Sequence, residues 1–251
     1  VQTCALPIYY LKNEEDITNM AEAIIMSNER KERSNADPFW DDSAIALHGA
    51  ETGLAMMLKK NATYADVLDL HYALKFEESG SGIETTLDDI FEKVEKKNPD
   101  CYALNCWRTF REAAPRTAKS IYVSMNATLN AFTPAIRSNM RKKTKIDFNK
   151  FAHERSILFV TTSPVKKGLH SLANMFVAQA ISELYEIAEK QPSGMLPIPT
   201  HISFDDFATG ARVAEFPEKI SIFREKGISC TLLIQSEAQL EKMYGPCGAI
   251  E

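Results

Sequence analysis

The chain has 251 residues, of which 45% are hydrophobic and 25% are charged, as is ordinary for a globular protein with a sizeable core. Its 29 basic and 34 acidic side chains give a net charge of −5, which argues against a surface that coats nucleic acid by phosphate neutralisation alone. Five scattered cysteines without zinc spacing, and no apolar run near the ~18 residues that span a bilayer, predict a soluble chain with reduced thiols.

The first 36 residues contain one predicted helix. The opening VQTCALPI has neither helical nor strand pattern, so we expect residues 1–8 to be a non-native leader and exclude them from fold reasoning. A helix is predicted from about Asn13, because apolar residues then recur on one helical face. That face consists of Ile17, Met20, Ala21, Ile24 and Ile25. Residues 27–36 are polar and charged, as is typical of a linker.

Residues 37–137 are predicted to be helical throughout. Asp37 can cap a first turn, and Pro38 suits the first helical position because its missing N–H is not needed there. Four more helices are expected: from Thr63, from Thr86 with a loose capping box to Asp89, from about Asp100, and over residues 118–129. Almost no strand signal accompanies them, so this stretch is interpreted as an all-α domain.

From residue 146 the pattern changes to alternating strands and helices. Residues 156–161, 198–204 and 229–234 are short, apolar and rich in β-branched side chains, as strands buried on both faces are. Residues 169–189, 216–226 and 237–244 carry helical periodicity. Such alternation predicts an α/β fold in which crossover helices join the strands of a parallel sheet.

Polar side chains follow two of these predicted strands. Asp205 and Asp206 come after the second strand, and Gln235 is the first polar residue after the third. Ligands of open parallel sheets bind beyond the carboxyl ends of the strands. Two adjacent acids there suit Mg²⁺ binding and activation of a water, as in a Walker B motif, and an amide could orient water or sense a terminal phosphate. The alternative is that the two aspartates only form a turn or a helix cap.

Residues 113–120 end in Lys119-Ser120, as a phosphate-binding loop does. We interpret this segment as the start of a helix, because a phosphate loop needs glycines whose amides wrap the phosphates, and this segment has none. The chain contains no GxxxxGK[ST] elsewhere. We therefore expect this polypeptide alone to hydrolyse nothing at a useful rate.

Three segments resemble the coupling proteins of conjugative type IV secretion systems, the TraG/TraD class. They are residues 204–208 (FDDFA), 216–229 (FPEKISIFREKGIS) and 233–245, which begins LIQSEAQL and ends Tyr-Gly. Residues 37–40 (DPFW) and 118–121 (AKSI) also look like the Gram-positive branch of that family. The resemblance is strong over about 201–245, weaker over 9–200, and absent over 1–8.

The resemblance implies a partial RecA-like P-loop NTPase core, its Walker B half, with an inserted all-α domain. It divides the chain into 9–36 and 138–251 as nucleotide-binding domain and 37–137 as the insertion. It further implies a membrane-anchored homo-hexamer, working at the cytoplasmic face of the bacterial membrane, that uses ATP and Mg²⁺. Its partners would be relaxase and relaxosome proteins, single-stranded DNA and the proteins of the secretion channel.

The same resemblance assigns roles to four residues. Asp205 would hold Mg²⁺, Asp206 would activate the catalytic water, Gln235 would sense phosphate, and Arg224 would be an intersubunit arginine finger. The family usually has Glu where this chain has Asp206, which is one methylene shorter. Because a misplacement of ~1 Å can lower a rate on the order of a hundredfold, turnover is expected to be slow or to use a differently placed water.

Two alternatives stay open. The helical block could be a non-catalytic docking module for relaxosome proteins or secretion substrates, or the chain could belong to another hexameric RecA-like DNA translocase. A basic cluster, Arg137, Arg141, Lys142, Lys143 and Lys145, could meet DNA phosphate, although a solvated connector is the favoured interpretation. The five histidines show no ligand spacing and are expected in the core or on helix surfaces.

Overall fold

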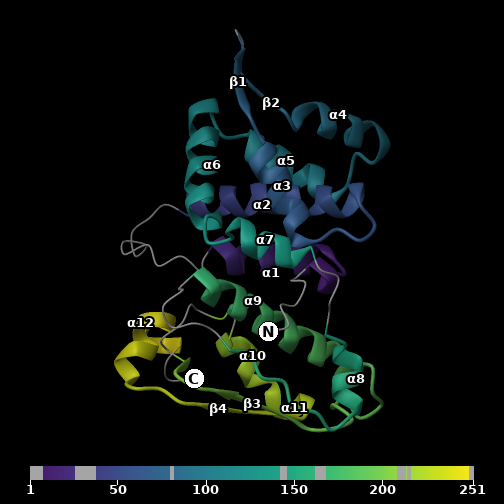
Figure 1. Ribbon diagram of the computed structural model, residues 1–251, viewed down its shortest axis with the longest axis vertical. Helices are drawn as coiled ribbons and strands as arrows, with labels where there is room; N and C mark the ends of the chain where they lie inside the picture. Colours follow the sequence, from purple (N-terminus) through teal and green to yellow (C-terminus); the bar gives the residue numbers. More distant parts are fainter. Residues whose placement is uncertain are drawn as a thin grey trace. The chain divides into compact units, whose positions relative to one another are not determined.

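The chain divides into two compact units, Val1–Lys145 and Ile146–Glu251, which are described separately (Figure 1). The computed structural model describes residues 8–25, 38–79, 82–141, 146–161, 168–207, 213 and 216–248. In these ranges, no helix combines the length and the apolar character that a membrane crossing requires.

The first unit is built around helix α2 (Phe39–Leu58), most of which is buried. Helix α5 (Tyr102–Arg111) packs against it where α2 carries glycine. A Cβ atom at Gly53 would lie 2.8 Å from that of Ala103, so the close approach of the two helices requires glycine. Helix α6 (Pro115–Leu129) also contacts α2 and contains Lys119 and Ser120, as predicted for the segment that mimics a phosphate loop.

Helix α1 (Glu14–Ile25) follows a 3-10 turn, η1 (Ile8–Tyr10), and confirms the predicted inner face. All five residues of that face are buried, and α1 packs against α2 and α6. The structure therefore groups α1 with the helical unit, whereas the sequence assigned 9–36 to the nucleotide-binding domain. Ile8, expected to belong to a leader outside the fold, is 5% exposed, and residues 1–7 lie outside the described residues.

The first unit contains a β-hairpin, so the all-α expectation is wrong for residues 76–79 and 82–85. Strands β1 (Phe76–Ser79) and β2 (Gly82–Thr85) pair antiparallel, and the ring of Phe76 packs on Tyr122 at 5.2 Å. The strands are rich in glutamate and lack apolar alternation, which hid them from a periodicity search. The Gly-Ser-Gly run between them was the available turn signal.

Two helices of this unit start at threonine–aspartate caps. Thr63 and Asp66 form a reciprocal capping box at α3 (Tyr64–Ala73), as predicted from Thr63. Helix α4 (Asp88–Lys97) begins two residues after the predicted Thr86, and the carboxylate of its first residue, Asp88, accepts two hydrogen bonds from Thr85. The hydroxyl of Thr86 instead donates to the carbonyl oxygen of Ala73.

Helix α7 (Pro134–Met140) holds the start of the basic cluster against α3. Arg141 forms ion pairs with Asp66 and Asp69, and Arg137 lies 3.9 Å from Asp69 and over the ring of Tyr72. These two arginines neutralise acids of their own unit, which weakens the DNA interpretation of the cluster. Lys142, Lys143 and Lys145 lie outside the described residues.

The second unit contains a parallel two-stranded sheet with helices. Helix α8 (Phe148–His153) packs on the long α9 (Gly168–Glu189), in which Phe176, Ile181 and Leu184 are buried. Strand β3 (Thr200–Phe204) is joined to β4 (Ile228–Leu232) through α10 (Phe216–Ser221) and α11 (Phe223–Lys226). Helix α12 (Glu237–Gly248) follows β4. The second and third predicted strands and the helices between and after them are therefore present.

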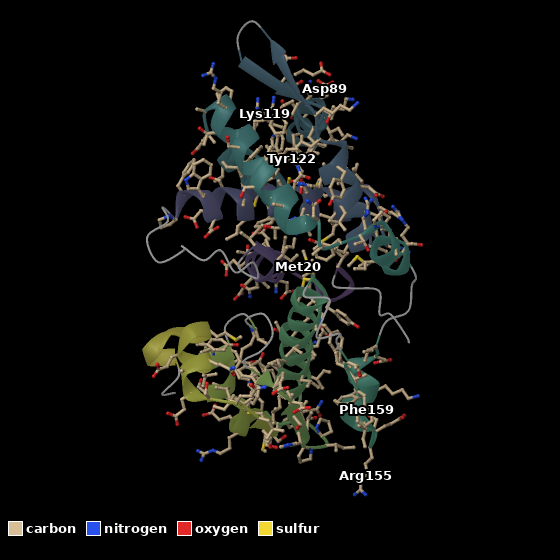
Figure 2. The ribbon with its side chains drawn as sticks, turned by 60° about the vertical axis from the view of Figure 1, so that its left-hand side comes forward. Met20, Asp89, Lys119, Tyr122, Arg155 and Phe159 are labelled. Carbon is tan, nitrogen blue, oxygen red and sulfur yellow. The ribbon has the colours of Figure 1, made fainter. Side chains whose placement is uncertain are left out.

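The first predicted strand, residues 156–161, is absent as a strand. The segment has no regular secondary structure, and Ile157 and Phe159 are 80% and 85% exposed. Figure 2 labels Phe159 and Arg155 at the outer side of this unit. Apolar composition indicates a demand for burial, but a strand forms only where its backbone finds a partner. In the described part of the chain, β3 pairs with β4 and not with this segment.

Candidate functional site

The candidate site lies where β3 and β4 end. The two strands pair parallel and in register, from Thr200 opposite Ile228 to Phe204 opposite Leu232. Because both strands run in the same direction, the residues that follow Phe204 and Leu232 lie at the same edge of the sheet. This edge is therefore the place where the predicted Asp205, Asp206 and Gln235 can meet.

Asp205 and Asp206 lie between two backbone hydrogen bonds that join the chain to Leu233, the residue after β4. The amide of Leu233 donates to the carbonyl oxygen of Phe204 over 2.9 Å. The carbonyl oxygen of Leu233 accepts a hydrogen bond from the amide of Phe207, also over 2.9 Å. The two aspartates between those anchors are lifted out of the strand, and both are exposed. Asp206 reaches a φ of 54°, which residues other than glycine rarely adopt. Such conformations cluster at functional sites, where surrounding contacts maintain them.

Gln235 reaches the second of the two acids. Its side-chain amide donates to Oδ1 of Asp206 over 3.0 Å. The convergence of these residues at one edge, which the sequence predicted from the strand ends alone, is thus observed. Asp205 alternates with Ser203 and His201 on the exposed face of β3. The edge presents two carboxylates and one amide to solvent, a set that can hold a cation and orient a water.

An aromatic cluster that the sequence analysis missed fixes the backbone just after the acids. Phe207 is 8% exposed and packs on Phe216 at 4.7 Å and on Tyr244 at 5.9 Å. The hydroxyl of Tyr244 accepts a hydrogen bond from the amide of Val213, at 3.1 Å. The cluster therefore ties β3, α10 and α12 together behind Asp206. Three aromatic residues at 204, 207 and 216 flanking the acid pair were the signal that could have revealed it.

Arg224 does not join this edge. It is exposed on α11, the helix that leads into the first residue of β4, whereas Asp206 and Gln235 follow the last residues of their strands. Within one chain, Arg224 therefore lies on the element that enters β4 and not at the strand ends that carry Asp206 and Gln235. An arginine finger, however, acts on the site of a neighbouring subunit, so that role stays a prediction.

The donor set at the edge fits Mg²⁺ in one specific way. In the ranges that the structure covers, no three His, Cys, Asp or Glu side chains are grouped to hold a metal ion. Mg²⁺ does not need such a cage, because it keeps several waters and binds through one or two carboxylates together with substrate phosphates. Asp205 could provide one such carboxylate, and waters and phosphate oxygens would have to provide the rest.

Comparison with known proteins identifies a family. The family model described as "Type IV secretory system Conjugative DNA transfer" matches residues 7–251, so the match includes the last two of the eight residues expected to be a leader. No curated protein matches the chain.

Solved structures of conjugative coupling proteins share its fold. The bacterial coupling protein TrwBdeltaN70 in complex with sulphate matches with a TM-score of 0.63 and 15% identity. The plasmid coupling protein TrwB in complex with a non-hydrolysable ATP analogue, ADPNP, matches with 0.60 and 15%. Each match covers 99% of this chain and 53% of the solved one, so the chain spans about half the length of these structures. At this identity the likeness establishes a shared fold and nothing more.

Proposed function

The chain belongs to the family of type IV secretory system conjugative DNA transfer proteins, and from that premise we propose that its second unit carries the water-activating half of an ATPase that powers DNA transfer. The contact between Gln235 and Asp206 carries the proposal, because it joins the ends of two neighbouring parallel strands at 3.0 Å. Family membership favours this function over the alternative of another RecA-like DNA translocase. The proposal concerns a longer protein, since it requires a phosphate-binding loop that these 251 residues do not contain.

Each residue at the edge has a distinct task in this proposal. Asp205, exposed and in no hydrogen bond to the rest of the edge, is assigned to Mg²⁺. Asp206 is assigned to the attacking water, and Gln235 both holds Asp206 and keeps its own side-chain oxygen available for water or phosphate. When bound, ATP supplies the phosphoryl group and Mg²⁺ neutralises phosphate charge. ADPNP bound to TrwB supports nucleotide as the cofactor.

Asp206 in place of the usual Glu is the sharpest point at which to test the proposal. An aspartate carboxylate lies closer to its backbone, but the positive φ lifts Asp206 out of the strand. If Asp206 activates water, Asp206→Asn removes the base and should lower ATP hydrolysis by about a hundredfold or more. Asp206→Glu keeps the charge and should retain or raise the rate.

The experiment measures ATP hydrolysis and mating frequency with a complete coupling protein that carries these residues. Asp205→Asn should weaken Mg²⁺ binding, so that hydrolysis requires a higher Mg²⁺ concentration. Glu225→Gln, which removes an exposed charge from α11, is the matched control with unchanged activity. Full hydrolysis by Asp206→Asn would rule out the assigned role of this acid. An equal loss of ATP hydrolysis in Glu225→Gln would show that removal of any acidic charge from this unit lowers the rate, and the effect would then not be specific to Asp206.

The arginine finger is proposed to act between subunits of a homo-hexamer. Arg224→Ala alone should lose hydrolysis, as should Asp206→Asn alone. Mixing the two variant proteins should restore part of the activity, because some interfaces then combine an intact Asp206 with an intact Arg224. Absence of any recovery in mixtures that still assemble would contradict a role in trans.

The helical unit is proposed as a docking unit for protein partners such as relaxase, other relaxosome proteins and secretion substrates. A groove of about 770 Å³ beside the hairpin is lined by six acids, with Arg108 and Arg111 already paired to two of them. The acids are Glu77, Glu84, Asp88, Asp89, Glu92 and Glu95. This charge disfavours DNA phosphate at that face and suits a basic protein segment.

The docking proposal can be tested separately from hydrolysis. Purified relaxase should bind the chain, and the double variant Glu77→Lys, Glu84→Lys should weaken binding while a reversal on the other unit, Glu218→Lys, does not. Binding of single-stranded DNA should be unaffected by the first variant if DNA contacts another surface. Equal relaxase affinity in all three proteins would exclude the groove.

A further inference from the structure

The first unit contains a buried polar network that the proposed chemistry does not use. His48 and Glu51 lie one turn apart on α2, and Tyr64 and His71 lie two turns apart on α3. All four side chains are 0% exposed. Charged or chargeable groups are seldom buried so completely without a paired arrangement, so the network is a built feature of the interface between the two helices.

Two hydrogen bonds and one charge contact connect the four residues in one line. The hydroxyl of Tyr64 lies 2.8 Å from Nε2 of His48, and Nδ1 of His71 lies 2.9 Å from the nearer oxygen of Glu51. The other oxygen of Glu51 is 3.7 Å from Nδ1 of His48, which is a charge contact rather than a hydrogen bond. One carboxylate thus stands between two imidazoles. In the described structure neither His48 Nδ1 nor His71 Nε2 has a hydrogen-bond partner.

The network can balance one extra proton but not two. With both imidazoles neutral and Glu51 ionised, its net charge is negative, and one proton on either ring makes it neutral. A second proton leaves an uncompensated cation among groups without solvent contact, and on His71 it would add a donor without an acceptor. Unpaired charges and donors in a dry core are strongly unfavourable.

Among the described residues, the neighbouring side chains that contact the network do not change this balance between pH 5 and 7. Tyr122 of α6, labelled in Figure 2, packs its ring 4.8 Å from that of His71, and its hydroxyl donates to the backbone carbonyl of His71. Tyr72 of α3 packs at 5.5 Å, and Arg137 of α7 sits over Tyr72. Neither tyrosine nor arginine is a side-chain type with an ordinary pKa in this range.

The pKa values of the network follow from the same geometry. Burial lowers the pKa of His48 below its ordinary 6.5, aided by the charge of His71, although Glu51 opposes the shift. Burial favours protonation of Glu51, but His71 and His48 outweigh it and hold the pKa of Glu51 below its ordinary 4.5. At His48 the unfolded chain therefore binds more protons than the folded one below pH 6.5, so the contribution of this group to stability is full above 6.5 and falls as the pH is lowered.

We propose that Tyr64, His48, Glu51 and His71 form a proton-sensitive latch that keeps α3 against α2 at neutral pH and releases it on acidification. The hairpin begins three residues after α3 ends, so release of α3 also frees the side of the unit that carries β1 and β2. The latch is a property of the first unit and does not depend on nucleotide hydrolysis.

Hydrogen–deuterium exchange of the whole chain between pH 7.5 and 5 tests the latch. After correction for the pH dependence of chemical exchange, the opening constant of amides in α3 should rise by up to about tenfold per pH unit below 6.5, the slope for one linked proton. His48→Gln keeps a neutral partner for Tyr64 and should flatten that slope. His153→Gln, at an exposed histidine of α8, is the matched control and should keep the wild-type slope.

Two results would overturn the latch: an α3 opening constant that does not change with pH, or an unchanged slope in His48→Gln. If that variant does not fold at pH 7.5, NMR of histidine-labelled wild-type chain replaces it. The His48 ring should then stay neutral in the folded state well below pH 6.5. A His48 ring that titrates in the folded chain at about 6.5 would contradict the proposal.

Discussion

The two units each contain a carboxylate held by a side-chain nitrogen at nearly the same distance. In the first unit Nδ1 of His71 lies 2.9 Å from Glu51, and in the second the amide of Gln235 lies 3.0 Å from Asp206. Glu51 and His71 are fully buried, whereas Asp206 and Gln235 are exposed. The two contacts have nearly equal lengths but should differ in energy, because solvent screens the exposed contact and not the buried one.

The same difference decides what each contact can do. An exposed carboxylate can exchange its amide partner for a water or a ligand at little free-energy cost, which an active site needs. A buried carboxylate cannot lose its partner without a large penalty, so it can hold helices together and respond to protons. Contacts of equal geometry are therefore assigned opposite roles by the burial of the residues that make them.

Removal of the buried carboxylate should have the largest effect. Glu51→Ala leaves two imidazoles without their anion in a closed core and should lower the free energy of unfolding of the first unit by about 3–5 kcal/mol. Both tryptophans, Trp40 and Trp107, belong to this unit, so urea unfolding followed by tryptophan fluorescence reports on it alone.

Glu92→Ala on the exposed side of α4 is the matched control, with a change within about 0.5 kcal/mol. The joint replacement Glu51→Leu with His71→Leu should lose less than Glu51→Ala, since no charge is then left unpaired. A loss below 1 kcal/mol for Glu51→Ala would mean that water reaches the network.

Loss of a neutral member of the network should have a smaller effect. Tyr64→Phe keeps the buried ring but removes the hydroxyl that bonds Nε2 of His48, leaving a buried nitrogen unsatisfied at about 1–3 kcal/mol. The same fluorescence measurement applies. Tyr72→Phe removes a hydroxyl that reaches the carbonyl of Leu129 from a half-exposed position, and should change stability by less than half as much. Equal losses would show that burial does not govern these bonds.

Most helices could be predicted because apolar residues at helical spacing indicate which face of the helix is buried. The inner face of α1 and the span of α9 follow from apolar spacing, and Thr63 starts α3 through a local cap. The hairpin and the fate of residues 156–161 could not be predicted, because strands depend on partners that are distant in sequence. Apolar composition alone cannot say whether such a partner is present.

The two polar sites differed in how visible they were. Asp206 and Gln235 could be paired from sequence because parallel neighbouring strands end at one edge, while Arg224 could not be placed, because a loop helix has no such rule. The buried network was hidden within helical segments. Its signal was that His48 and Glu51 lie one turn apart among the small and apolar residues in the middle of α2, with His71 on the following helix.

The smallest expected effect is that of breaking the exposed contact. Gln235→Ala removes the amide that bonds Asp206, but water can replace it, so stability should change by no more than about 0.5 kcal/mol. The second unit has no tryptophan, and hydrogen exchange of the amides in β3 and β4 therefore supplies the measurement. Ile228→Ala, at a residue 4% exposed in β4, should accelerate that exchange strongly and shows that the assay detects damage. If Gln235→Ala loosened the strands as much as Ile228→Ala does, the contact would be part of the framework like that of Glu51, and solvent exposure would no longer distinguish a ligand site from a structural one in this chain.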